Sequence, residues 1–287
     1  MKNFNIKILM IITLAVILLL TATSCGRDNN EIYIVTREEG SGTRSAFVDL
    51  AGVKDQEGRD LITQKAEVTN STAVMLQTIA GNKNAIGYVS LGSLSNNVKT
   101  VAVQGVTINP SNIKKGKYKI ARPFNVVVGQ QKSPLAQDFI SFILSKEGQE
   151  IVESQGYISQ GAKYAYQEKE EMAGKITIAG STSVAPVVEI IGEEYMKLYP
   201  NVKLEVQQSG SSAGITAVKE GVSDIGLASR DVSGEELGGS MKVVKIAMDG
   251  IAIIVNKENP VENLSGDQVK KIFSGNVGLW KGEVDHE

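Results

Sequence analysis

The sequence predicts an α/β fold with largely parallel sheets, and two observations support this prediction. Short apolar runs that are typical of buried strands alternate with segments whose apolar residues recur at helical spacing. Turns rich in glycine, serine and threonine join several of these strands to the helices that follow. With 287 residues, the chain is long enough for two compact domains or one large one.

In the first half of the chain, the clearest helix is predicted over residues 133–144. Ser133 is a suitable N-cap for this helix, and Pro134 suits its first position. The other elements expected here are strands over residues 31–35, 101–103 and 124–128, and a helix over residues 43–50.

A new unit begins after the charged stretch of residues 167–171. It repeats the order of strand, turn and helix twice, which is the pattern that predicts parallel strands. The expected elements are strands 175–179 and 203–206, turns 180–183 and 209–212, helices 186–198 and 213–220, and a buried strand 251–255.

The N-terminus has the pattern of a targeting segment. An apolar run over residues 8–20 is too short to span a bilayer comfortably and ends in small residues just before Cys25. This pattern resembles a bacterial lipobox, although Ala22 stands where the motif usually has leucine. The resemblance implies a signal peptide over residues 1–24, a diacylated Cys25 and a polar tether over residues 25–30. A secreted form without the lipid is the alternative.

The composition is that of an ordinary soluble globular protein, with 42% hydrophobic and 22% charged residues. The formal net charge of −2 gives no sign of a nucleic-acid-binding surface. An anionic ligand would therefore have to be attracted by a local site. Cys25 is the only cysteine, so no disulfide within the chain is expected.

Three turns contain the candidate ligand-binding residues, at residues 40–43, 180–183 and 210–212. Each is expected to lead into a helix, whose N-terminus offers free backbone N–H groups and a partial positive charge to an anion. Arg37 and Arg230 lie beside these turns, and the arginine fork suits oxyanions. Taken singly, each turn could be a plain N-cap and each arginine a surface ion pair. Together they can converge on one tetrahedral anion, because ligands in these folds bind beyond the carboxyl ends of strands.

The motifs at these positions resemble those of the phosphate-binding protein of ABC-type phosphate importers. The matching segments are residues 175–186, 208–214, 224–230, 35–44 and 84–90. The resemblance implies a two-lobe clamshell of the periplasmic-binding-protein type (type II) that closes on a dehydrated phosphate. Hydroxyls, backbone amides and an arginine would hold the anion. The phosphate contacts that it implies, with Arg230 added as a neighbouring ligand-binding residue, are Arg37, Ser41, Gly42, Thr43, Thr182, Ser183, Ser211 and Arg230.

One departure from the family concerns anion selectivity. Some members place an aspartate after the Ala-Ser pair of the third motif, where it accepts the proton of hydrogen phosphate. This chain has Arg230 at that position, and Asp231 follows it. An acceptor carboxylate disfavours sulfate, which has no proton to donate. Sulfate or molybdate therefore stays open as the ligand.

The second departure is the order of the segments, which is that of a circular permutant. The segment that opens the family's mature chain begins here at Lys175, and the segment from the family's middle begins at Val35. The old termini would be joined through a linker over residues 161–174. A misassembled or truncated gene is the alternative.

The permuted order implies one lobe from residues 31–122 and 257–287 and another from residues 123–256. The chain would cross between the lobes near residues 123–124 and 256–257. We expect Trp280 to lie in the lobe of Ile32, and Tyr157 and Ile176 to lie close together in the other lobe. The linker should be exposed with little core contact.

The predicted function is extracytoplasmic capture of inorganic phosphate by a lipid-anchored monomer at the cell membrane. ABC permease and ATPase subunits would be its partners, with no cofactor, metal or nucleic acid. A phosphate sensor that does not serve transport is an alternative that the sequence leaves open. A phosphatase or serine hydrolase is disfavoured, because the only histidine, His286, lies next to the C-terminus.

Overall fold

The computed structural model describes residues 30–130, 133–162 and 164–280. The chain divides into two units, Met1–Glu31 and Ile32–Glu287, and every element discussed below lies in the second. The expected signal peptide, the expected lipidation at Cys25 and almost all of the tether lie outside the described residues. None of the helices in the described part of the chain has the length and apolarity that a membrane crossing requires.

In the described ranges, 11 strands form one sheet, in which the order β2-β1-β3-β10-β5-β9-β7-β8 runs from edge to edge. β4 pairs with β10 and β11, and β6 pairs with β10. The strands are β1 (Tyr33–Arg37), β2 (Glu67–Thr69), β3 (Ala85–Ser90), β4 (Val98–Val103), β5 (Ala121–Gly129), β6 (Ile158–Ser159), β7 (Gly174–Gly180), β8 (Val202–Gln208), β9 (Ile225–Ala228), β10 (Met241–Asn256) and β11 (Asn263–Leu264).

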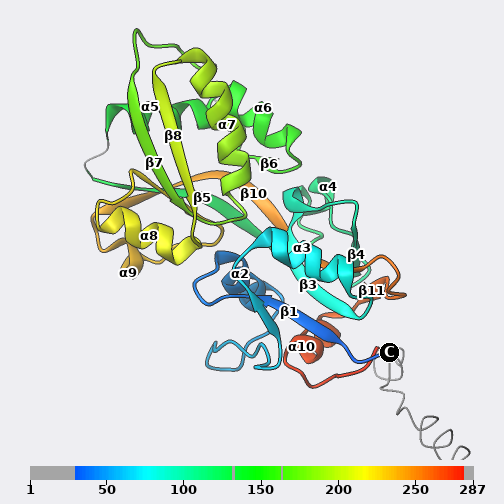
Figure 1. The fold of residues 1–287 in the computed structure, drawn as a ribbon. Helices are drawn as coiled ribbons and strands as arrows, with labels where there is room; N and C mark the ends of the chain where they lie inside the picture. Colours follow the sequence, from blue (N-terminus) through cyan, green and yellow to red (C-terminus); the bar gives the residue numbers. More distant parts are fainter. Residues whose placement is uncertain (1–29, 131–132, 163, 281–287) are drawn as a thin grey trace, which may run out of the picture. The chain divides into compact units, whose positions relative to one another are not determined.

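Helices cover this sheet in two groups (Figure 1). α2 and α3 pack on β1 and β3, whereas α5, α7 and α8 pack on β7, β8 and β9. The helices are α2 (Gly42–Leu50), α3 (Thr72–Gly81), α4 (Pro110–Lys114), α5 (Pro134–Leu144), α6 (Lys146–Ser154), α7 (Ala185–Leu198), α8 (Ser211–Lys219), α9 (Gly234–Leu237) and α10 (Gly266–Phe273).

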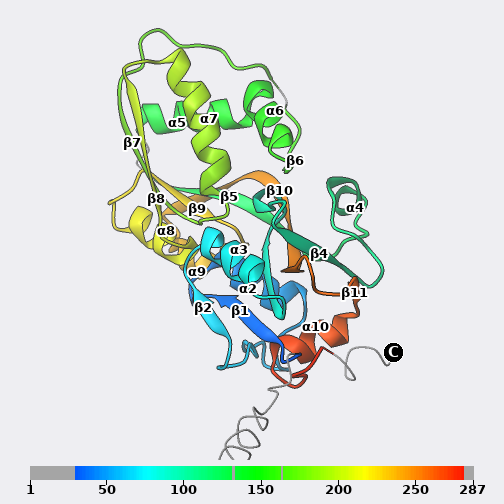
Figure 2. The same cartoon turned by 45° about the vertical axis from the view of Figure 1, so that its right-hand side comes forward.

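The buried apolar residues form two large cores, with a small additional cluster that includes Ile215 and Val218 of α8. The first core contains residues of β1, β3, α2, α3 and α10, and the second contains residues of β5, β7, α5 and α7. Among the strands of residues 30–130, 133–162 and 164–280, only the long strands β5 and β10 have residues in or beside both cores. They run from one group of elements to the other (Figure 2). The two strands pair antiparallel over most of their length.

The sheet is mixed, so the prediction of largely parallel sheets is only partly right. β1 pairs parallel with β2 and β3, and β7 pairs parallel with β8 and β9. β10, however, runs antiparallel to β3, β4, β5 and β6. Only residues 251–255 of β10 were predicted as a strand, because its first half mixes lysines with apolar residues and does not read as a buried run.

Several predicted helix starts are confirmed. The Ser133 side chain accepts a hydrogen bond from the Ala136 N–H, and Pro134 is the first residue of α5. The Ser41 side chain caps α2 by accepting from the Arg44 N–H. α3, α6 and α10 were not predicted, and each begins after a serine N-cap in a segment without a glycine-rich turn.

The first and last described segments of this unit lie side by side at the first core. Ile32 and Trp280 both belong to that core, as expected, and the Ile32 N–H donates to the Gly278 carbonyl at 2.8 Å. Tyr157 and Ile176 both belong to the second core. Residues 251–255 of the predicted second lobe pack in the first core, so the crossing within β10 lies earlier than residues 256–257.

Residues 161–174 are exposed at most of their described positions, as expected, but Tyr166 and Met172 are half-buried and pack against the second core. Tyr166 packs edge-on against Phe142, with ring centroids 5.0 Å apart, and its hydroxyl hydrogen-bonds the buried carboxylate of Asp138. The Lys169 ammonium lies 2.8 Å from the other oxygen of Asp138. The segment is polar in composition, but it contains Tyr166, an aromatic residue that can pack against the second core.

Candidate anion-binding site

Four helices begin where the two cores meet: α2 and α3 from the first, and α7 and α8 from the second. α2 lies beside α8 in both views of the fold (Figures 1 and 2). Each of the four helices follows the carboxyl end of a strand, namely β1, β2, β7 and β8. Their N-termini bring free N–H groups and partial positive charge to one place, which favours an anion there.

Hydroxyl groups from opposite sides meet at these helix starts. Thr43 Oγ1 of α2 lies 2.9 Å from Ser183 Oγ, which precedes α7. Thr72 Oγ1 of α3 lies 3.0 Å from Thr182 Oγ1 in the same turn. All four residues are buried. Hydroxyls can rotate to donate, so a buried group of them can replace the hydration shell of an oxyanion.

The start of α8 contributes a third contact between the two sides. Gly42 packs so closely on α8 that a Cβ at this position would lie 2.3 Å from Ser211 Oγ and 2.7 Å from Ser229 Oγ. Ser229 accepts from the Ser181 hydroxyl at 2.9 Å, and its own N–H donates to Ser211 Oγ. We call the seven residues Thr43, Thr72, Ser181, Thr182, Ser183, Ser211 and Ser229 the hydroxyl cluster.

Arg37 supplies a buried cation at the edge of the hydroxyl cluster. It is the last residue of β1, and its Nη1 lies 3.4 Å from Thr72 Oγ1. Its Nε and Nη2 also donate to the carbonyls of Thr69 and Asn70, both at 3.2 Å. These bonds fix the guanidinium plane against the start of α3, where it can meet an anion with defined geometry.

Glu38 is a charged partner of the site that the sequence did not single out. Its two carboxylate oxygens accept from Nε and Nη2 of Arg37, each at 2.9 Å. A Cβ on Gly210, next to the start of α8, would lie 3.3 Å from Glu38 Oε1, so this carboxylate also approaches the second side of the site. Asp231, by contrast, is exposed.

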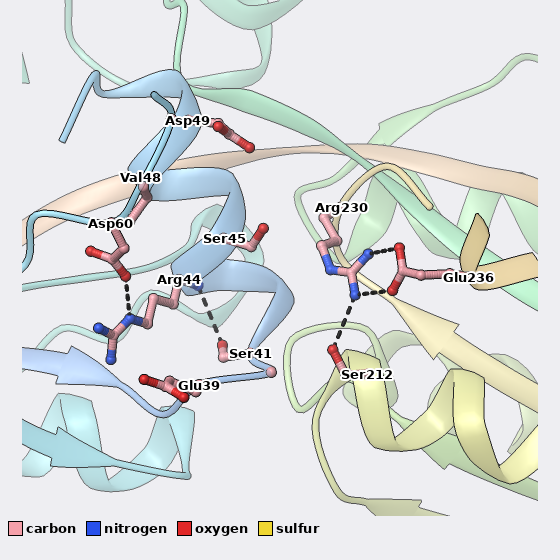
Figure 3. Close-up of a pocket in the computed structure, with 12 residues that line it drawn as sticks. Glu39, Ser41, Arg44, Ser45, Val48, Asp49, Asp60, Ser212, Arg230 and Glu236 are labelled. Atoms are coloured by element: carbon pink, nitrogen blue, oxygen red, sulfur yellow. Dashed lines mark hydrogen bonds and ion pairs between the residues drawn. The ribbon is translucent and has the colours of Figure 1, made fainter. Parts of the chain in front are cut away.

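Arg230 lies at a cavity of about 400 Å³ that Ser41 and Ser212 also line (Figure 3). Its Nη2 donates to Ser212 Oγ at 3.1 Å and to Glu236 at 2.6 Å. The pairing with Arg230 lowers the pKa of the Glu236 carboxyl below its usual value. Across the same cavity, Arg44 pairs with Asp60 at 2.7 Å.

The structure thus brings together most of the residues predicted from the sequence. Ser41 acts as an N-cap, which is the alternative use of a turn serine, and Arg230 bonds Glu236 and Ser212 instead of a residue of the hydroxyl cluster. The predicted residues that gather at the four helix starts are Arg37, Gly42, Thr43, Thr182, Ser183 and Ser211.

Three hydroxyl residues were not predicted as site residues. Ser181 and Ser229 lie within the family motifs at residues 175–186 and 224–230, so the sequence contained enough information to predict them. Thr72 begins α3 after a polar Asn-Ser pair. That turn was not predicted, because it lacks the glycine by which the other turns were recognised. In the portions of the chain that the structure describes, no group of three or more His, Cys, Asp or Glu residues could hold a metal ion.

A match to the PBP superfamily domain covers residues 25–147 and 165–284 of the chain. Among individual relatives, the phosphate-binding protein PstS of Pseudomonas aeruginosa is 36% identical over 116 residues, which span 38% of this chain and 36% of that protein. That match therefore covers less than half of either chain.

Two streptococcal proteins match over nearly the full length. The phosphate-binding protein PstS 2 of Streptococcus agalactiae is 48% identical over 266 residues, which span 89% of this chain and 90% of that protein. The crystal structure of a phosphate-binding protein of a phosphate ABC transporter from Streptococcus pneumoniae matches with a TM-score of 0.70 and 41% identity, covering 87% of this chain and 98% of that chain. The chain therefore belongs to the PBP superfamily and, within it, to the same family as these streptococcal phosphate-binding proteins.

Proposed function

We propose that this protein captures inorganic phosphate outside the cytoplasm and delivers it to an ABC phosphate importer. The observation that carries the proposal is the meeting of four helix N-termini, buried hydroxyls and Arg37 between the two cores. Such a site holds a dehydrated oxyanion by donated hydrogen bonds alone. The names of the streptococcal relatives support phosphate as that anion.

The two cores would be the two lobes of the clamshell, and β5 and β10 would be the hinge strands between them. Opening would separate the threonine and serine pairs that now meet across the site, and phosphate would enter there. We infer a binding role and not a catalytic one. The site offers hydrogen-bond donors and the Arg37 cation to an anion, and its nearby carboxylate, Glu38, is engaged in holding Arg37 in place.

Calorimetric titration of the mature protein with phosphate, sulfate and molybdate tests the ligand. We expect phosphate to bind with micromolar or tighter affinity, on the order of −8 kcal/mol. Sulfate and molybdate should bind more weakly. No heat with phosphate, together with clear binding of sulfate or molybdate, would make the protein a receptor for that other oxyanion.

The route to transport is tested in cells that lack the chain and its relatives. If the protein serves import, its loss should lower the initial rate of radiolabelled phosphate uptake, and the gene should restore that rate. A phosphate sensor would instead change the expression of phosphate-regulated genes while uptake by the assembled importer stayed normal.

We propose that the protein is a monomer held at the outer face of the cell membrane by a lipid on Cys25. The Cys25→Ser variant should then leave the membrane fraction, because acyl chains supply the membrane affinity. Phosphate binding should be unchanged in that variant. Its continued presence in the membrane fraction would favour an uncleaved signal anchor.

The segment order is proposed to be that of a native circular permutant. The contact between Ile32 and Gly278 supports this order, because segments that are far apart in this chain would be consecutive in the unpermuted one. The near full-length match to PstS 2 of Streptococcus agalactiae, against a partial match to the Pseudomonas aeruginosa protein, also supports an order shared among close relatives.

A further inference from the structure

A buried ion pair joins the two strands that connect the cores. Arg122 of β5 and Asp249 of β10 face each other in the antiparallel register, with side chains that are 1% and 0% exposed. Arg122 donates from both Nε and Nη2 to Asp249 Oδ2, each at 3.1 Å. Burial raises the pKa of Asp249 to about 6, whereas the charge and hydrogen bonds of Arg122 favour the ionised carboxylate.

The remaining polar atoms of this pair reach opposite sides of the molecule. Asp249 Oδ1 accepts from the Ser90 hydroxyl at 2.9 Å and from the Leu91 N–H at 3.1 Å, at the end of β3. Arg122 Nη1 donates to the Ser229 carbonyl at 3.0 Å, just after β9. The pair therefore links the first core to the loop that follows β9.

That loop is part of the proposed anion site. The side chain and N–H of Ser229 bond Ser181 and Ser211, which belong to the hydroxyl cluster. Asn125, also on β5, donates to the carbonyl of the next residue, Arg230, at 2.8 Å. The β5 side chains of Arg122 and Asn125 thus donate to the consecutive backbone carbonyls of Ser229 and Arg230, in the loop that carries part of the site.

Stability alone does not account for such a pair, because apolar residues of similar volume are often as stable in its place. We propose that Arg122 is a positioning residue for the anion site, acting through the Ser229 carbonyl. It fixes the loop after β9 so that Ser211 and Ser229 meet the start of α2 when the two cores come together. This inference rests on the proposed function for its link to phosphate.

The test is the double variant Arg122→Met/Asp249→Asn. It removes both charges together, so no unpaired charge is left buried. The new asparagine keeps an oxygen that can accept from Ser90 and Leu91, whereas the donor to the Ser229 carbonyl is lost. We expect a thermal midpoint close to that of the wild type, phosphate affinity at least tenfold weaker, and faster amide exchange over residues 225–231 without ligand.

Gln149→Met is the matched control. Gln149 is also buried and also donates to two backbone carbonyls, those of Ile143 and Ile246, at 2.9 and 3.1 Å. This variant should lower the thermal midpoint and leave the phosphate affinity within twofold of wild type. Arg122→Lys, which keeps the charge and a donor, should bind phosphate more tightly than the double variant.

Three results would overturn the inference. They are phosphate affinity of the double variant within twofold of wild type, unchanged amide exchange over residues 225–231, or an equal loss of affinity in Gln149→Met. The exchange comparison uses ligand-free protein and so tests the positioning role by itself. Absence of phosphate binding by the wild type would instead contradict the proposed function.

Discussion

Arg37 is the buried cation of the proposed site, and its loss should weaken phosphate binding strongly. A charge-assisted hydrogen bond to a desolvated anion is worth roughly 2–5 kcal/mol, so Arg37→Ala should lower the affinity by that amount. Calorimetry on the folded variant measures this loss. Lys65→Ala, which removes an exposed charge outside the site, should change little.

The carboxylate of Glu38 could also weaken phosphate binding in Arg37→Ala, because that substitution leaves it near the site without its cation. The double variant Arg37→Ala/Glu38→Gln removes that repulsion. If Arg37 itself binds the anion, the double variant should still bind phosphate at least tenfold more weakly than the wild type. Affinity equal to wild type in the double variant would show that Arg37 serves only to neutralise Glu38.

Gly42 offers a substitution that should block binding without harming the fold. A methyl group there would lie 2.3 Å from Ser211 Oγ and 3.0 Å from its Cβ, so the start of α2 could not approach α8 as closely. Gly42→Ala should weaken phosphate binding at least tenfold. The free energy of unfolding should change little, because the clash lies between α2 and the second side of the site, which can separate, and not within the core that α2 packs on.

Gly81→Ala, in the last turn of α3 where a Cβ meets nothing within 4 Å, is the control for this substitution. It should bind phosphate as the wild type does. Wild-type affinity in Gly42→Ala would show that the close contact between α2 and α8 is unnecessary for binding.

At the scale of elements, the segment over residues 161–174 is docked by a buried carboxylate. Burial alone would raise the pKa of Asp138, but hydrogen bonds from Lys169, Tyr166 and Tyr195 bring it below its usual value. A lowered folded-state pKa contributes stability that is present at neutral pH. That stability is lost as the pH falls through and below about 4, where aspartates usually titrate.

Asp138→Asn should therefore be less stable than the wild type at neutral pH, and the difference should shrink as the pH falls below about 4. Urea unfolding at a series of pH values measures it. Tyr164→Phe, a substitution of an exposed residue in the same segment, should have little effect. Equal stability of wild type and Asp138→Asn at neutral pH would contradict the role given to this carboxylate.

Three of the four helix starts at the site could be predicted from the sequence, and the fourth, that of α3, could not. Glycine-containing turns predicted the starts of α2, α7 and α8. In these turns the glycines indicate a tight backbone, and the neighbouring serines and threonines supply hydroxyl donors. The start of α3 at Thr72 and the Glu38 carboxylate were missed, because neither has a local pattern. Their importance comes from the sheet order, which places β2 beside β1.

Contacts between distant segments also explain why the docking of residues 161–174 and the full length of β10 were not predicted. The polarity of residues 161–174 correctly predicted that most of the segment is exposed, but it gave no sign that Tyr166 and Lys169 would bond the buried Asp138 of α5. β10 was predicted only where it is uniformly apolar, although its lysine-containing half pairs with β5 over many residues. Pairing between distant segments decided both cases, and one sequence does not reveal such pairing.

At the scale of the whole molecule, the proximity of Ile32 and Gly278 makes a rearranged chain possible. Joining Trp280 to Ile32 through a short Gly-Ser linker and opening the chain between Glu170 and Glu171 would keep Tyr166 and Lys169 attached to the second core. We expect this chain to fold and to bind phosphate within about tenfold of wild type, since the break falls between two exposed residues and the new junction joins segments that already lie side by side. Circular dichroism and calorimetry measure the two properties.

Opening the same joined chain inside β10, between Gly250 and Ile251, is the control, because that cut severs a strand that is buried between its neighbours. This control should not fold. Failure of the chain opened at Glu170 would contradict the proposal that the present order is a permutation of a fold that tolerates either order.

A crystal structure of the mature protein grown with phosphate tests the central proposal most directly. The anion should lie between the two cores, in contact with Arg37, Thr43, Thr182, Ser183 and Ser211, at the starts of α2, α7 and α8. A phosphate bound instead in the cavity between Arg44 and Arg230, with the hydroxyl cluster still closed on itself, would contradict the site assigned to it.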